Sequence, residues 1–196
     1  MMHFTDLSGL LGIAFAIAVL IVPFAARVHG RAVLPYIAVC MLLTLLPFDG
    51  LSVAAYLRGL SGDLSMASLL LLTLALRRRM LFNTDEWAGR TEILVLIVLA
   101  ALALYPLALG IGMFDSYRPG FGEVWFIAVL LLLVLIAWRR KNYLIALWIS
   151  SAVLTWSLGW YESSNLWDYL IDPWGSIYAL GALLRCGASM SVKRSF

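Results

Sequence analysis

The sequence predicts an all-α membrane protein, a polytopic bundle of about seven transmembrane helices, and two observations carry this prediction. Hydrophobic residues make up 63% of the 196 residues and charged residues only 13%, and the mean hydropathy is +0.96. So little polar surface cannot cover a water-soluble globule of this length. The apolar residues also form continuous runs rather than alternating at every second position, and this favours helices over a barrel.

Apolar segments recur along the whole chain and are separated by short loops. We expect a single membrane domain over residues 1–196, because these loops leave no room for a soluble domain. No basic stretch precedes the first apolar run, so we expect that run to remain as a helix rather than to be a cleaved signal. The predicted spans are 7–26, 32–48, 60–76, 91–114, 124–138, 143–160 and 173–186.

The lysines and arginines divide unevenly between the two sides that seven crossings define. Twelve fall on one side, and only Arg58 and Arg118 fall on the other. Because cytoplasmic loops carry the excess of positive charge, this division predicts an N-terminus outside and a C-terminus in the cytoplasm. We therefore expect an integral protein of a bacterial cytoplasmic (inner) membrane, with the lipid bilayer as its first partner.

Acidic residues divide in the opposite sense, with eight on the outer side and three on the inner side. Acidic residues contribute little to membrane orientation, so topology does not explain this asymmetry. This excess of acidic residues indicates that a functional site lies on the outer side of the protein.

Two of the predicted spans, the third and the seventh, are too short to cross alone. The apolar run between Asp63 and Arg77 has 13 residues, about 20 Å of helix against the roughly 30 Å of a bilayer core. The polar segments 49–63 and 161–172 precede the two short helices, and we expect them to be re-entrant or to lie at the interface. Interrupted helices at matching places indicate a site, and they predict 3+1+3 parallel halves joined by the fourth span.

Two local signals mark expected helix starts. The stretch "NTDE" at 83–86 has the spacing of a capping box, and Asp63 stands where an N-cap of the third span belongs.

We predict an anion-binding site at the outer ends of spans three and seven. Arg58 and Arg118 are its cations, because the planar guanidinium donates two parallel hydrogen bonds to a phosphate or carboxylate. The alternative is that both arginines extend to the lipid headgroups and pair with Asp63 or Asp115. The residues expected to hold the arginines or to bind hydroxyl groups are Asp63, Glu162, Asp168 and Asp172.

Aromatic residues gather beside these acids, and they have two interpretations. Trp160, Trp167 and Trp174 form a platform for a sugar ring in one interpretation, since aromatic faces beside carboxylates suit C–H faces and hydroxyl groups. In the other they belong to the aromatic belt that membrane proteins place at the interface.

The sequence argues against metals, cofactors and nucleic acid as ligands. His3 and His29 fall on opposite sides of the predicted membrane, and Cys40 and Cys186 have no CxxC spacing. The basic clusters stand beside apolar runs, where topology explains them without nucleic acid.

Three classes of function remain, in order of preference. The first is a non-catalytic accessory or binding component of a cell-envelope assembly or export system, with an outer cavity for an anionic or lipid-linked group such as a glycan. The second is a small transporter or lipid flippase. The third is a membrane enzyme that acts on a lipid-linked phosphate or sugar with outer carboxylates, and no catalytic residue is assigned because apart from His3 the outer side lacks His, Cys and Lys.

Overall fold

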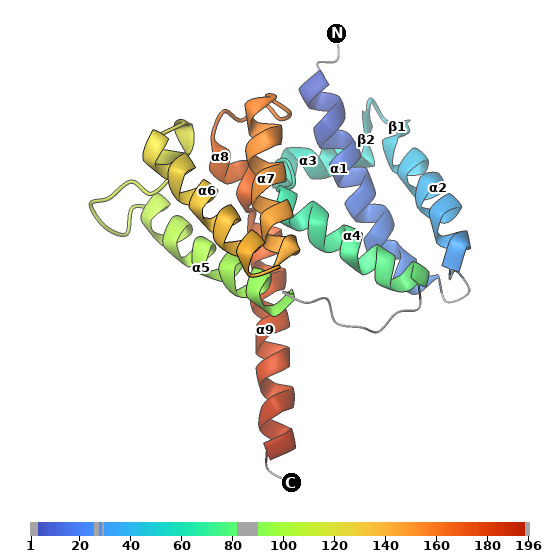
Figure 1. The fold of residues 1–196 in the computed structure, drawn as a ribbon. Coiled ribbons are helices and arrows are strands. Elements are labelled where there is room, and N and C mark those ends of the chain that lie inside the picture. Colours follow the sequence, from blue (N-terminus) through green and yellow to red (C-terminus); the bar gives the residue numbers. More distant parts are fainter. Residues whose placement is uncertain (1–3, 26–27, 29, 82–89, 195–196) are drawn as a thin grey trace. The chain divides into compact units, whose positions relative to one another are not determined.

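The computed structural model describes residues 4–25, 28, 30–81 and 90–194, with side chains as far as Cys186. The described chain is mostly helical, which confirms the all-α prediction (Figure 1). It divides into two compact units. Unit 1 comprises residues 1–64, 68–85 and 155–164, and unit 2 comprises 65–67, 86–154 and 165–196. Whether they form one membrane domain stays a prediction.

Unit 1 holds the first three predicted spans. Its elements are α1 (Phe4–Ile21), the 3-10 turns η1 (Val22–Phe24) and η2 (Gly30–Ala32), α2 (Val33–Leu45), the hairpin strands β1 (Pro47–Phe48) and β2 (Leu51–Ser52), α3 (Val53–Ser61) and α4 (Met66–Leu81) from residue 68 onward. The hairpin pairs Pro47 with Ser52. Its turn places both Asp49 and Gly50 at positive φ, as a tight hairpin turn requires.

The core of unit 1 forms along α1. The helix α1 packs against α2 and α3, and α3 lies across α1 rather than along it (Figure 1). Ala54 is fully buried, and its small side chain lets α3 approach α1 closely. The buried apolar residues form two clusters, Leu10, Ile13, Ala14, Ala54 and Leu64 near α3, and Ala18, Val19, Val22, Val33 and Ile37 toward the other end of α1.

Unit 2 holds the later predicted spans. Its elements are α5 (Arg90–Ala108), the 3-10 turn η3 (Arg118–Phe121), α6 (Val124–Arg139), α7 (Tyr143–Ser157) as far as residue 154, α8 (Leu166–Leu170) and α9 (Pro173–Arg194). The helices α5 and α9 pack against each other. The indole N–H of Trp148 on α7 donates to the carbonyl of Leu170, 2.8 Å away, and ties α7 to the end of α8.

Asp172 anchors the helix starts in unit 2. One carboxylate oxygen accepts from the N–H of Gly175 at 2.7 Å, so Asp172 caps α9, whose first residue is Pro173. The other oxygen accepts from the N–H of Ser65 at 2.8 Å and from its hydroxyl at 2.7 Å, and Ser65 directly precedes α4. A single side chain, 5% exposed, therefore serves the starts of both α4 and α9. The helix α9 has 22 residues, so the prediction of a short seventh helix is wrong.

Several predicted boundaries are wrong. The third helix begins at Met66 rather than 60, because Gly62 at φ +72° ends α3 and a turn follows. Asp63 is therefore not the N-cap of that helix. The fourth helix ends at Ala108 rather than 114, where Gly110 and Gly112 take positive φ. The "NTDE" capping box at 83–86 lies outside the described residues.

Two described helices are long and apolar enough to cross a membrane: residues Phe4–Phe24, with a mean hydropathy of 2.5, and Arg90–Ala108, with 2.2. Three further apolar helices are shorter, Gly30–Leu45, Val124–Arg139 and Tyr143–Ser157. The finding supports an association with membranes, and the full set of seven crossings stays a prediction.

Replacing Asp172 by Asn should lower the stability of the protein. The amide turns one acceptor into a donor that faces the N–H donors of Ser65 or Gly175, so at least one charge-assisted bond is lost, at about 2 kcal/mol. Thermal unfolding of the full chain in detergent measures the effect. Glu92→Gln, which changes an exposed carboxylate in the first turn of α5, is the matched control. Equal melting of the two variants would contradict the capping role.

Candidate functional site

Arg58 lies at the centre of a cluster of carboxylates in unit 1. Its Nε donates to Oδ1 of Asp63 at 2.6 Å and its Nη2 to Oδ2 at 3.3 Å, so the pair is bidentate. Nη1 donates to Oδ1 of Asp6 at 3.1 Å, and Nη2 lies 3.4 Å from a carboxylate oxygen of Glu162. The exposed fractions of the side chains are 16% for Arg58 and Asp63, 30% for Asp6 and 64% for Glu162.

Local structure brings these residues together. Arg58 lies in the last turn of α3, and the positive φ of Gly62 turns the chain back so that Asp63 faces it. Asp6 lies in the first turn of α1, where a carboxylate also complements the helix dipole.

Hydrogen bonds hold the segment that carries Glu162. The phenol of Tyr161 donates to the carbonyl of Leu64 at 2.8 Å, and the hydroxyl of Ser8 donates to the carbonyl of Trp160 at 2.5 Å. The ring of Trp160 meets that of Phe4 edge-on, with centroids 5.1 Å apart. Glu162 is thus presented from a fixed backbone.

The cluster carries a formal charge of −2, because one guanidinium faces three carboxylates. The hydrogen bond to Asp63 raises the pKa of Arg58 above its ordinary value, and Asp6 raises it further, while burial acts in the opposite direction. Arg58 therefore stays charged at every pH at which the protein folds. A site of this charge disfavours anions, and its carboxylates suit hydroxyl groups or cations instead.

A groove of about 410 Å³ lies beside the cluster. Its lining includes the apolar residues Leu10, Leu51 and Ala55 together with the charged residues of the cluster. Such a combination of apolar lining and convergent polar groups is typical of a small-molecule site.

At Gly9 the ion pair of Arg58 and Asp63 comes close to the backbone of α1. A Cβ atom built on Gly9 would collide with Oδ1 of Asp63 and Nε of Arg58. The ion pair therefore rests directly on the backbone of α1, which only glycine permits.

In unit 2, α8 holds the loop that carries Arg118. The amide of Asn165 donates to the carbonyl of Tyr117 at 2.9 Å, and the indole of Trp167 donates to the carbonyl of Ser116 at 2.9 Å. The phenol of Tyr117 donates to the carboxylate of Asp168 at 2.7 Å. Trp167 and Asp168 thus support the loop. Arg118 itself is exposed, and its backbone N–H, not its side chain, reaches Asp115 at 3.3 Å.

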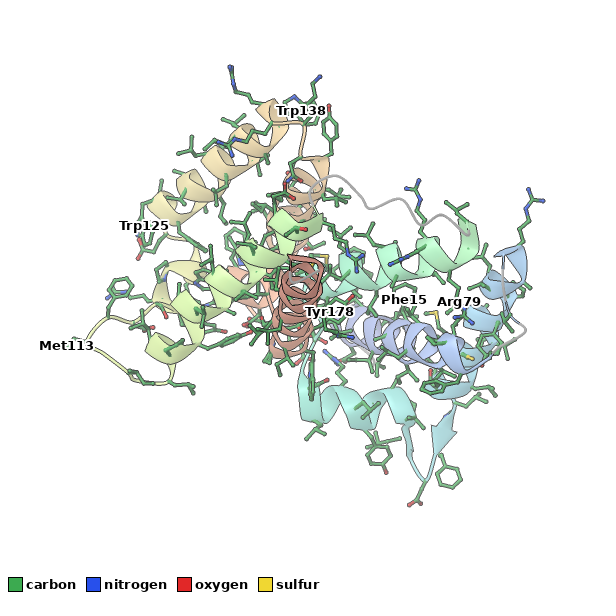
Figure 2. All side chains as sticks on the ribbon, turned by 90° about the horizontal axis from the view of Figure 1, so that it is seen from below. Phe15, Arg79, Met113, Trp125, Trp138 and Tyr178 are labelled. Carbon is green, nitrogen blue, oxygen red and sulfur yellow. The ribbon has the colours of Figure 1, made fainter. Side chains whose placement is uncertain are left out.

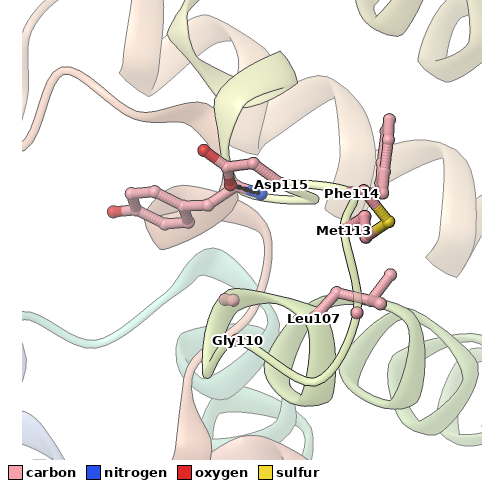
Figure 3. Close-up of a pocket in the computed structure, with 8 residues that line it drawn as sticks. Leu107, Gly110, Met113, Phe114 and Asp115 are labelled. Atoms are coloured by element: carbon pink, nitrogen blue, oxygen red, sulfur yellow. Dashed lines mark hydrogen bonds between the residues drawn. The ribbon is translucent and has the colours of Figure 1, made fainter.

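An open hollow of about 540 Å³ lies beside the loop before Arg118. Figure 3 shows Met113, Phe114 and Asp115 across this hollow from Leu107 and Gly110. Its lining side chains are apolar except for those of Asp115 and Tyr117.

The predicted site residues fall in both units. Arg58, Asp63, Glu162 and Trp160 belong to unit 1, where the first three meet, and Arg118, Asp168, Asp172, Trp167 and Trp174 belong to unit 2. The pairing of Arg58 with Asp63 agrees with the alternative to anion binding. Asp172 is engaged at the helix starts, and Trp174 is 55% exposed.

Two important residues were not predicted, Asp6 and Gly9. Asp6 was counted among the outer acids, but nothing in the sequence indicates its contact with a residue 52 positions away. A glycine within an otherwise apolar helix was the available signal for Gly9.

Comparisons with protein-family models, with curated proteins and with solved structures found no match to this chain.

Gly9→Ala should disturb the cluster and lower the stability by about 1 to 3 kcal/mol, because the added methyl group needs the space of the ion pair. Gly12→Ala on the same helix is the control, since its Cβ would lie 3.9 Å from the nearest atom, on Leu69. Thermal unfolding of both variants in detergent measures the difference. A Gly9→Ala protein as stable as Gly12→Ala would refute the close approach.

Arg58→Met should destabilise the protein by about 2 kcal/mol, because Asp6 and Asp63 then face each other's charge without a cation. The partial exposure of the pair keeps the loss below that of a fully buried one. Adding Asp63→Asn should recover part of the loss, since it removes one orphaned charge. A double-mutant cycle measures the coupling, and strictly additive effects would show that the pair does not interact energetically.

Proposed function

We propose that this protein is a non-catalytic, polytopic membrane protein that binds a hydroxyl-rich headgroup of a membrane-anchored molecule, such as a lipid-linked glycan. In this proposal it serves as an accessory component of a cell-envelope assembly in a bacterial inner membrane. The observation that carries the proposal is the groove beside Arg58, where a fixed cation orients three carboxylates and one of them, Glu162, stays 64% exposed.

The membrane part of the proposal is supported by apolar side chains that are more than half exposed. Only 22% of the apolar stretch of α5 is buried in the protein. Leu99 is 56% exposed and Leu102 64% exposed on this helix, and Leu131 on α6 is 58% exposed. Helices that are apolar on all sides and exposed on most of them are stable in lipid rather than in water.

The choice of a neutral polar headgroup follows from charge and hydrogen bonding. The net negative charge disfavours the anionic group that the sequence predicted, because Arg58 already serves three carboxylates. Carboxylate oxygens accept from sugar hydroxyl groups, and the apolar lining of the groove suits the start of a lipid chain.

A binding role is favoured over catalysis by how the carboxylates are used. Asp63 is paired with Arg58, Asp168 accepts from Tyr117, and Asp172 accepts from Ser65 and Gly175. A general base needs a lone pair that points at the substrate. These three side chains hold parts of the protein instead.

Glu162→Gln should weaken the binding of a sugar lipid about fivefold, since one charge-assisted hydrogen bond becomes a neutral one. The probe is monoglucosyl diacylglycerol, offered to the full chain in phosphatidylcholine nanodiscs and compared with diacylglycerol by native mass spectrometry. Glu123→Gln, at an exposed acid before α6, is the matched control. Equal retention of the two lipids, or unchanged binding by the Glu162→Gln variant, would contradict the proposal.

A further inference from the structure

The loop between α5 and η3 exposes an unusual run of apolar side chains. Leu109 is 80% exposed, Ile111 68% and Phe114 60%, and Met113 is fully exposed. Met113 lies at the outer edge of unit 2, well away from the helices of that unit (Figure 2). Residues 107–114 contain no polar side chain. In water such a loop would fold back onto the protein to bury this surface.

The base of this loop is fixed, so its exposure is not that of a loose segment. The hydroxyl of Ser116 donates to the carbonyl of Leu104 at 2.9 Å, which fastens the loop to the last turns of α5. Asn165 and Trp167 hold the carbonyls of Tyr117 and Ser116 from the side of α8. The loop therefore presents its apolar side chains in a defined place and keeps the hollow of about 540 Å³ open (Figure 3).

A cation and aromatic side chains follow the loop directly. Arg118 is exposed, and within the described residues its guanidinium makes no hydrogen bond or ion pair. Phe121 is 59% exposed and Trp125 52% exposed. An apolar surface followed by a cation and aromatic rings is the pattern of a membrane interface, with the cation at the level of the lipid phosphates.

The length of α5 matches the thickness of a bilayer core. Its 19 residues span about 28 Å at about 1.5 Å per residue, close to the thickness of a bilayer core. If Arg90 begins at one interface, the loop lies at the other.

We propose that the loop 109–118 binds a phospholipid of the outer leaflet. An acyl chain occupies the hollow beneath Met113 and Phe114, and the phosphate pairs with Arg118. The inference rests on the membrane placement of the proposed function, but it does not depend on the sugar-binding groove.

A phospholipid fits these residues better than a protein partner does. The loop offers only methyl, methylene, thioether and ring surface, which gives no directional contact for a specific protein. The cation Arg118 stands at the end of the apolar run, as charge does in a phospholipid. The other charged residue of the loop is Asp115, and its Oδ1 accepts from the backbone N–H groups of Tyr117 and Arg118.

The depth of the loop is tested by spin labels in the full chain. The two cysteines of the chain, Cys40 and Cys186, are first replaced by Ser, and Met113, Leu102 and Ser164 are then replaced by Cys one at a time. In nanodiscs, a label at Met113 should be more accessible to oxygen than to a water-soluble nickel complex, as a label at Leu102 should be. Ser164, exposed and polar, should give the opposite result.

Three depth results would overturn the inference, and they can be told apart. Water access at both Met113 and Leu102 would reject the membrane placement and with it the proposed function. Water access at Met113 with lipid access at Leu102 would reject only the lipid-bound loop. Protection of Met113 from both reagents would indicate a protein partner, and it would likewise overturn the phospholipid.

The phosphate contact is tested by lipid retention. Native mass spectrometry of the full chain from nanodiscs that contain phosphatidylglycerol should show retained lipid, and Arg118→Gln should reduce it about fivefold, the loss of one charge-assisted bond. Arg139→Gln, an exposed arginine at the far end of α6, is the control and should leave retention unchanged. Displacement of the lipid by excess inorganic phosphate alone would show a free-anion site and overturn the acyl-chain contact.

Discussion

Where an apolar helix of this protein begins, the chain must satisfy its own free backbone N–H groups, and polar side chains beside the helix supply the acceptors: Ser52 for α3, Asn165 for α8 and Asp172 for α9. Asp172 takes N–H groups before two helices. Asp115 takes two in the loop after α5. In a chain with so little charge, each such residue governs the position of a long apolar segment, because an unsatisfied N–H group away from water costs several kcal/mol. The excess of acids on one side of the predicted membrane follows in part from this need.

The cluster around Arg58 obeys a different requirement. One guanidinium holds two well-enclosed carboxylates, and a third, Glu162, keeps most of its surface exposed. The contact with Asp6 joins α3 to α1, the contact with Asp63 joins α3 to the turn that follows it, and Glu162 leaves acceptor capacity in the lining of a groove. The geometry of the groove therefore depends on the ion pairs of Arg58.

Much of this organisation could be predicted from the sequence. Long apolar runs indicated the helices. The predicted site grouped Arg58, Asp63 and Glu162 with Arg118, Asp168 and Asp172, whereas the structure has the first three in unit 1 and the other three in unit 2. The net charge around Arg58 was not predicted, because the contact of Asp6 with Arg58 joins residues from separate helices and has no local signal. The helix ends at Gly62 and Ala108 were also missed, since positive-φ turns within apolar stretches interrupt hydropathy without changing its mean.

Gly9 carries an implication for how this protein changes over generations. A side chain at position 9 would need the volume that the guanidinium of Arg58 fills. A substitution at either position therefore changes which residues the other position tolerates. In a collection of related sequences we expect these two sites to covary: lineages that keep the arginine retain glycine, whereas lineages that have lost it accumulate alanine or serine in its place. The same constraint would let an alignment recognise the groove in distant relatives whose remaining residues have diverged.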